Sequence, residues 1–171
     1  NGSIRDNEVS GATIHGVFIN GPAGDWTIEN NLVENNGGNG FQFLNVDDTL
    51  GTLTIRNNIA NNNGRDGIGL QGGPGLGTTL TMIGNTTSGN GRHGLDIFFY
   101  GDEDLPTSIV NHTASNNNSH GISLGRGTGP VQILGTTANN NGGSGLRIFD
   151  WNHTNPAHQI QIMNEGDVDC D

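Results

Sequence analysis

The sequence predicts an all-β solenoid, a right-handed parallel β-helix of about six to seven rungs, and three observations lead to this fold. A four-residue pattern of glycine, an apolar residue, any residue and an apolar residue occurs six times along the chain. The glycines of this pattern are 24, 27, 27, 27 and 24 residues apart, a period typical of repeat architectures. Apolar and polar residues also alternate at a fixed place in the repeats, as in β-strands, and no segment shows helical periodicity.

We expect two or three short strands in each repeat, and two of them flank a tight corner. The first strand lies fourteen to twelve residues before the repeat glycine, at 26–28, 53–55, 80–82, 107–109 and 131–133. Residues seven before the glycine, such as Ala60 and Ala114, are small enough for an inward corner. The second strand begins at the glycine, at 16–19, 40–43, 67–70, 94–97, 121–124 and 145–148. Residues 159–162 repeat the first-strand pattern and predict a partial seventh rung.

A chain of this pattern has few ways to fold. Parallel strands that return every ~25 residues without crossover helices must coil so that each rung stacks on the previous one. Parallel connections are overwhelmingly right-handed, which sets the expected hand. Asparagines recur at two fixed positions and predict stacked amide ladders at the turns. One column is Asn31, Asn58 and Asn85, and the other is Asn36, Asn63, Asn90, Asn117 and Asn141.

Length and composition predict one β-helix domain over residues 1–166, followed by an acidic tail at 167–171. The chain has 171 residues, a net charge of -11, six arginines and no lysine. Nucleic acid binding requires a basic face, so we exclude nucleic acid as a partner. No apolar run approaches the ~18 residues of a membrane span, so we expect no membrane insertion. The single cysteine, Cys170, has no partner for an internal disulfide.

The acidic tail has carboxylates at alternate positions, Asp167, Asp169 and Asp171. Calcium loops of the EF-hand type place ligands at positions 1, 3 and 5. The tail therefore resembles the truncated start of a dockerin or EF-hand module, and the alternative is an acidic tail without a role.

Two columns on successive rungs gather groups that carry chemistry. On a β-helix, residues 27 apart become neighbours about 4.8 Å apart. The column before the repeat glycine contains Asp66, His93 and His120, and the column two residues after it contains Asp96 and Arg147. Carboxylates, imidazoles and a guanidinium suit acid–base chemistry on a sugar, so we predict that these five residues are catalytic. Two alternatives are a transition-metal site of Asp and His ligands and polar residues that simply face solvent.

The loops after the second strand vary most, and variable loops on one side of a solenoid commonly build its binding face. We expect Phe99, Tyr100, Arg126 and Trp151 to contact substrate. Acidic residues of the same loops offer hard oxygen ligands that suit Ca²⁺, the one cofactor that the sequence suggests. These candidate calcium ligands are Asp47, Asp48, Asp102, Glu103 and Asp104.

The run 60–70, Ala-Asn-Asn-Asn-Gly-Arg-Asp-Gly-Ile-Gly-Leu, and its sister runs resemble repeats of the pectin-lyase-like superfamily from residue 3 to about 164. This superfamily includes polysaccharide lyases, glycoside hydrolases, uronate epimerases, tailspikes, adhesins and copper-site maturation proteins. Residues 119–125 resemble the histidine-glycine motif of polygalacturonase-type hydrolases, and Arg147-Ile148 resembles the start of their Arg-Ile-Lys motif. Phe149 replaces the lysine, and the adjacent aspartate pair has no counterpart.

The resemblance implies an extracellular domain, secreted or at a cell surface, that binds or processes polysaccharide on the face of rungs three to six. Lyase or hydrolase activity on uronic-acid polymers is the enzymatic form of this hypothesis. The alternative is a non-catalytic structural or adhesive part of a longer β-helical protein. Strand edges at uncapped ends would then favour end-to-end self-association.

Overall fold

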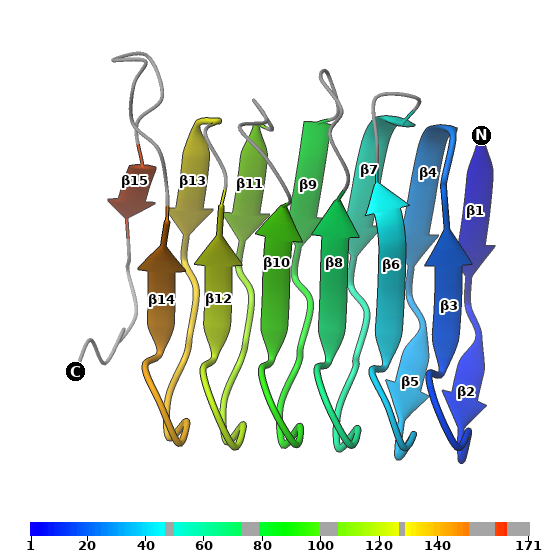
Figure 1. Cartoon of the computed structure of the whole chain (residues 1–171), viewed down its shortest axis with the longest axis horizontal. Helices are drawn as coiled ribbons and strands as arrows, with labels where there is room; N and C mark the ends of the chain where they lie inside the picture. Colours follow the sequence, from blue (N-terminus) through cyan, green and yellow to red (C-terminus); the bar gives the residue numbers. More distant parts are fainter. Residues whose placement is uncertain (47–49, 73–78, 100–105, 127–128, 151–159, 164–171) are drawn as a thin grey trace.

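The computed structural model describes residues 1–46, 50–72, 79–99, 106–126, 129–150 and 160–163. Within these residues the chain forms fifteen strands and no helix, and each strand pairing is parallel. Figure 1 shows the strands stacked as successive coils of one solenoid, with β1 and β15 at opposite ends of the stack. The predicted parallel β-helix is therefore the observed fold.

Two large sheets form the walls of the solenoid. The seven-stranded sheet contains, in spatial order, β1 (Gly2–Arg5), β4 (Gly24–Glu29), β7 (Leu50–Arg56), β9 (Thr79–Ile83), β11 (Thr107–Val110), β13 (Val131–Leu134) and β15 (Ile160–Met163). The six-stranded sheet contains β3 (Val17–Asn20), β6 (Phe41–Val46), β8 (Ile68–Gly72), β10 (Leu95–Phe99), β12 (Ile122–Gly125) and β14 (Leu146–Phe149). A short third sheet pairs β2 (Glu8–Ser10) with β5 (Leu32–Glu34).

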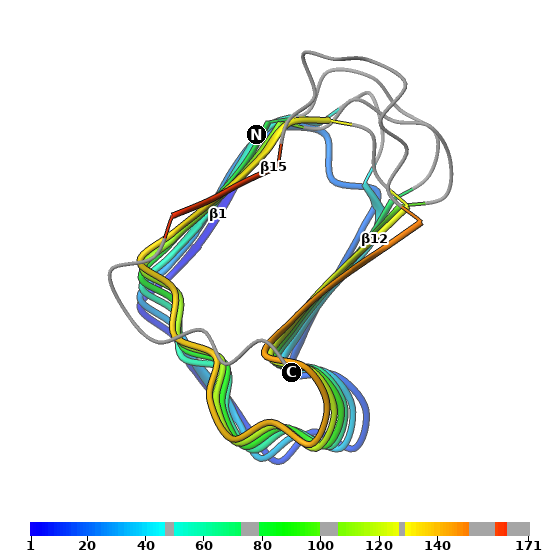
Figure 2. The ribbon, with the colours of Figure 1, turned by 90° about the vertical axis from the view of Figure 1, so that its left-hand side faces the viewer.

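The register follows the repeat predicted from the sequence. Leu95 lies between Ile68 and Ile122, residues that are 27 positions away on either side. Ile160 pairs with Val131, which confirms the partial rung predicted at 159–162. Viewed along the axis, the described coils superpose closely (Figure 2).

The core is a thin apolar column between the two large sheets. Ile28, Ile55 and Ile109 point inward from the seven-stranded sheet, and Phe41 and Leu95 point inward from the six-stranded sheet. All five side chains are fully buried, because strand alternation directs every second residue of both sheets to the interior. The predicted small residues occupy the corner, where Ala60 and Ala114 are also fully buried.

Close packing between neighbouring coils explains why glycine recurs in every repeat. A Cβ added at Gly94 would lie 2.7 Å from the carbonyl oxygens of both Gly121 and Thr87. That distance is too short for a carbon atom against backbone, so each coil passes close to the next only because this position lacks a side chain. The glycine therefore marks the rung in the sequence and permits the stacking in the structure.

Both predicted asparagine ladders are present, and all their members except the half-buried Asn141 are buried. In the longer ladder, the backbone N–H of Asn63 donates to Asn90 Oδ1 at 3.0 Å, and the N–H of Asn90 donates to Asn117 Oδ1 at 3.0 Å. The Asn90 amide nitrogen also donates to the carbonyl of Ala60 at 3.0 Å. Each amide thus satisfies polar backbone groups that the turn would otherwise leave unpaired.

The shorter ladder ends at His112, which occupies the asparagine position in the next rung. This imidazole is fully buried, and burial lowers its pKa to about 4. Its Nε2 lies 2.9 Å from the hydroxyl of Thr87, whereas its Nδ1 has no hydrogen-bond partner. The substitution therefore leaves one unsatisfied polar atom in the core.

Candidate functional site

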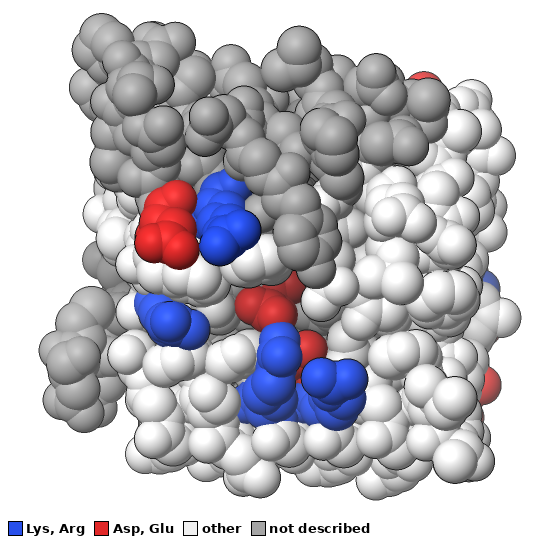
Figure 3. Space-filling model, viewed as in Figure 1, with Lys and Arg blue, Asp and Glu red and all other residues white. Residues whose placement is uncertain are grey.

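The predicted site lies on the outer face of the six-stranded sheet, over β8, β10, β12 and β14. Asp96 pairs with Gly69 on one side and Ser123 on the other, and Ser123 pairs with Arg147. Figure 3 shows charged side chains gathered over this part of the face, whereas the part over β3 and β6 is mostly white. The fold therefore brings the two predicted columns side by side.

The column before the repeat glycine is a ladder in its own right, because each side chain accepts the backbone N–H of the next rung. Asp66 N–H donates to Asn39 Oδ1 at 3.0 Å, and His93 N–H donates to Asp66 Oδ1 at 3.1 Å. The N–H of His120 then donates to His93 Nδ1 at 3.1 Å, and that of Ser144 to His120 Nδ1 at 2.9 Å. These residues hold the coils together as well as lining the face.

This ladder sets the tautomer of both histidines. A backbone N–H can only donate, so Nδ1 of His93 and of His120 carries the lone pair and Nε2 carries the proton. The rings stack with centroids 5.1 Å apart and an interplanar angle of 13°. Both neutral rings therefore present an N–H donor at Nε2 instead of a basic nitrogen.

The electrostatics of the histidines favour the same neutral form. Burial lowers the pKa of His93 to about 4, and the nearby positive charges of Arg92 and Arg147 add to the effect against the opposing influence of Asp66. The pKa of His120 is also lowered, by burial and by Arg147. At neutral pH both rings are therefore uncharged.

Arg92 clamps the two carboxylates of the site. Its Nε donates to Asp66 Oδ1 at 2.8 Å, and its Nη2 forms an ion pair with Asp96 Oδ2. Asp66 is 2% exposed and Asp96 is 7% exposed. Burial raises the pKa of Asp96, and the negative charge of Asp66 acts in the same direction, while Arg92 and a hydrogen bond from Ser123 oppose the shift.

The transition-metal alternative meets two obstacles in this geometry. Asp66, His93 and Asp96 do bring one ligand atom each within 4.8 Å of one another. Both carboxylates, however, already bind the guanidinium of Arg92, which is a resident cation. The lone pair of His93 already accepts a backbone N–H, and a metal needs that lone pair free. The cluster is better described as an internal ion-pair network than as an open metal site.

A pocket of about 290 Å³ opens beside this network, towards β12 and β14. The pocket is lined by polar, charged and aromatic side chains. Its lining residues are Gln71, Arg92, His93, Asp96, Phe98, Ser123, Arg147 and Phe149. On the other side of Asp96, the side chain of Asn39 packs over Gly69. Only the Ser123 side is therefore open.

Phe98, Phe149 and Arg147 form one wall of the pocket, and Arg126, a predicted substrate contact, lies beside Phe98 but outside the lining. Phe98 and Phe149 stack with centroids 6.0 Å apart. The Arg147 guanidinium carbon lies 4.1 Å from the Phe149 ring centroid, and that of Arg126 lies 5.5 Å from the Phe98 ring centroid. Arg126 also approaches Asp150 at 3.8 Å. The exposed Arg147 guanidinium thus lies over an aromatic ring and also lines the pocket.

The predicted catalytic residues differ in their exposure. Asp66, His93 and Asp96 are buried, and Arg92 forms ion pairs with both carboxylates. Asp66 does not line the pocket and acts through Arg92 and the backbone of His93. His120 is half-buried and Arg147 is exposed.

Sequence reasoning missed five lining residues, of which Ser123 lies in the same repeat column as Asp96 and Arg147. Arg92 occupies a repeat position that also carries Arg65, a recurrence of rare cations that was a usable signal. Gln71, Phe98 and Phe149 belong to the column four residues after the repeat glycine, which varies too much to stand out as a pattern. Recurrence therefore pointed to Arg92, whereas the members of this column share no residue type that would predict the wall.

Several predicted residues lie outside what the structure describes. The side chain of Phe99 is among them, as are the candidate contacts Tyr100 and Trp151. The same holds for the acidic tail at 167–171 and for the candidate calcium ligands Asp47, Asp48, Asp102, Glu103 and Asp104.

The stacked parallel sheets place this protein in the class of parallel β-solenoids. A family profile described as "Right handed beta helix region" matches residues 1–104, more than half of the chain. The chain therefore belongs to the right-handed β-helix family. Neither a curated protein nor a solved structure gave a match. Among the described residues, none forms a helix long and apolar enough to cross a membrane.

Proposed function

We propose that the pocket over β8, β10, β12 and β14 binds an acidic polysaccharide through the carboxylates of its sugar residues. The supporting observation is a concentration of hydrogen-bond donors in a chain whose net charge is -11. Arg92, His93, Ser123, Arg147 and Gln71 all place donor groups on the pocket. The acceptor Asp96 is already engaged by Arg92 and Ser123, so the groups left for a ligand are mainly donors.

The aromatic wall supports a sugar ligand. Phe98 and Phe149 add apolar ring surface to the pocket lining, against which the C–H groups of a sugar can pack. Arg147, held over the Phe149 ring, can bind a carboxylate through two parallel N–H groups, which a lysine cannot do. Charges separated by more than the ~8 Å screening length at physiological salt interact weakly, so the chain's distant acidic groups do not prevent this contact.

Replacing Arg147 tests this proposal. We expect Arg147→Gln to weaken binding of oligogalacturonate by about tenfold to a hundredfold, the loss of a charge-assisted hydrogen bond. Titration calorimetry measures the affinity. Arg5→Gln is the matched control, because it changes the net charge equally on the other sheet, where Glu29 keeps Arg56 as a partner. The proposal is wrong if wild type binds no acidic glycan or if Arg147→Gln binds as tightly as wild type.

A catalytic form of the proposal rests on Asp96. It is the one carboxyl group among the described lining residues, and its pKa is raised, which favours proton transfer nearer to neutral pH. His93 and His120 are poor candidates for the base, because the ladder occupies their lone pairs. Release of unsaturated or reducing ends by wild type, lost in Asp96→Asn with binding retained, would identify an enzyme.

A further inference from the structure

The outer face of the seven-stranded sheet changes character halfway along the solenoid. On its first three strands, Glu29 forms ion pairs with Arg5 and Arg56. On the last four strands, β9, β11, β13 and β15, no residue is ionisable. In a chain with 17 acidic residues, this uncharged half is a distinct surface, on a different sheet from the site described above.

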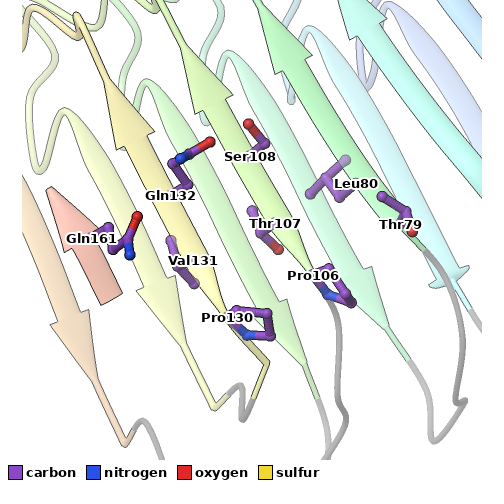
Figure 4. Close-up of a pocket in the computed structure, with 9 residues that line it drawn as sticks. All are labelled: Thr79, Leu80, Pro106, Thr107, Ser108, Pro130, Val131, Gln132 and Gln161. Carbon is purple, nitrogen blue, oxygen red and sulfur yellow. The ribbon is translucent and has the colours of Figure 1, made fainter. Parts of the chain in front are cut away.

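A hollow of about 330 Å³ lies on this uncharged half (Figure 4). Its lining residues are Thr79, Leu80, Pro106, Thr107, Ser108, Pro130, Val131, Gln132 and Gln161. Hydrogen bonds between strands fix its rim, since Leu80 N–H donates to the Pro106 carbonyl at 3.0 Å and Thr107 N–H donates to the Pro130 carbonyl at 2.9 Å. The hollow is therefore preformed by the backbone, as binding sites for small ligands and sugars usually are.

The polar groups of the hollow follow the axis of the solenoid. Ser108 pairs with Gln132, and Gln132 pairs with Gln161, so their outward side chains stand in a row with the ~4.8 Å spacing of neighbouring strands. Pro106 and Pro130 add apolar ring surface beside this row. A linear ligand lying along the axis would meet a polar group at every rung.

We propose that this hollow binds a neutral polysaccharide, at a site separate from the acidic-glycan pocket. Hydroxyl and amide groups both donate and accept, which matches sugar hydroxyls, and the proline rings offer apolar surface to C–H groups. An ionised ligand would lose water here without meeting an opposite charge on these four strands, which disfavours acidic chains. Charge and hydrogen-bonding character thus select an uncharged, hydroxyl-rich partner.

The isosteric change Gln132→Glu tests the proposal by placing one carboxylate in the middle of the row. We expect it to weaken binding of a galactomannan, a xylan and hydroxyethyl cellulose by at least tenfold, because a donor is lost and a charge must be desolvated. Affinity electrophoresis and calorimetry measure the change. Gln71→Glu is the matched control on the six-stranded sheet: it should leave these affinities unchanged and weaken oligogalacturonate binding.

Three results would overturn the proposal: no binding of any of these neutral probes, equal binding by wild type and Gln132→Glu, or a wild-type dimer in light scattering that Gln132→Glu dissociates. The last result would identify the face as a contact between two copies. Oligogalacturonate binding reports on the first site alone, so failure of either proposal is seen independently of the other.

Discussion

His93 and His120 each use Nδ1 to hold neighbouring coils together, and His93 also lines the pocket. The backbone of the next rung occupies Nδ1 in each ring, so the imidazoles act as fixed N–H donors. The same column contains Asn39, whose Oδ1 accepts the N–H of Asp66 in the same manner. The residue type can therefore change along this column, from Asn to Asp to His, while the hydrogen bonds between the coils stay the same.

We expect nitrogen NMR to show the Nε2–H tautomer for both histidines at pH 6, with His93 still neutral. Its pKa of about 4 is below the ordinary value near 6.5, so the unfolded chain binds a proton first as the pH falls. This histidine therefore destabilises the fold progressively from about pH 6.5 towards pH 4.

His120→Asn is the control for this measurement, because it keeps the acceptor in the ladder and removes one set of imidazole signals. A protonated His93 at pH 6, or an Nδ1–H tautomer, would contradict the assigned roles.

At the scale of the element, the shorter asparagine ladder is interrupted at one position, where two residues depart from the repeat together. His112 replaces an asparagine, and Thr87, in the corner column of Ala60 and Ala114, supplies its one hydrogen-bond partner. The neighbouring rungs show the intact arrangement, in which Asn58 N–H donates to Asn85 Oδ1 at 3.0 Å.

Restoring the repeat at both positions, His112→Asn with Thr87→Ala, should stabilise the chain by about 1–3 kcal/mol, the usual cost of an unsatisfied buried polar group. Thermal unfolding followed by circular dichroism measures the change. The reverse substitution Asn58→His, in an intact ladder, should destabilise by a similar amount. A double variant that melts below wild type would show that His112 is well accommodated.

A structural feature could be predicted from the sequence where the residue that causes it recurs in every repeat. The glycine at Gly94 and its copies predicted the strand register, because stacking imposes the same steric limit on every rung. The burial of Asp66 could not be predicted in this way. It depends on the direction of one side chain, Arg92, which bridges two rungs and which the repeat pattern does not determine.

At the scale of the whole molecule, the solenoid separates two surfaces with different chemistry. Strands β10 and β14, with Arg92 in the turn before β10, carry the cations and aromatic rings of the pocket. Strands β9, β11, β13 and β15 of the opposite sheet carry no ionisable residue. The repeat predicted the shape of the molecule, and the departures from the repeat indicated where function is concentrated. Net charge alone gave no sign of either surface, because both depend on local placement.

The central claim is that the pocket over β8, β10, β12 and β14 binds an acidic polysaccharide. Its most direct test is amide NMR of the 171-residue chain during titration with oligogalacturonate. We predict that the shifted signals centre on Asp96, Ser123, Arg147 and Phe149, with little change on the seven-stranded sheet. Signals that shift elsewhere, or none that shift at saturating oligosaccharide, would contradict it.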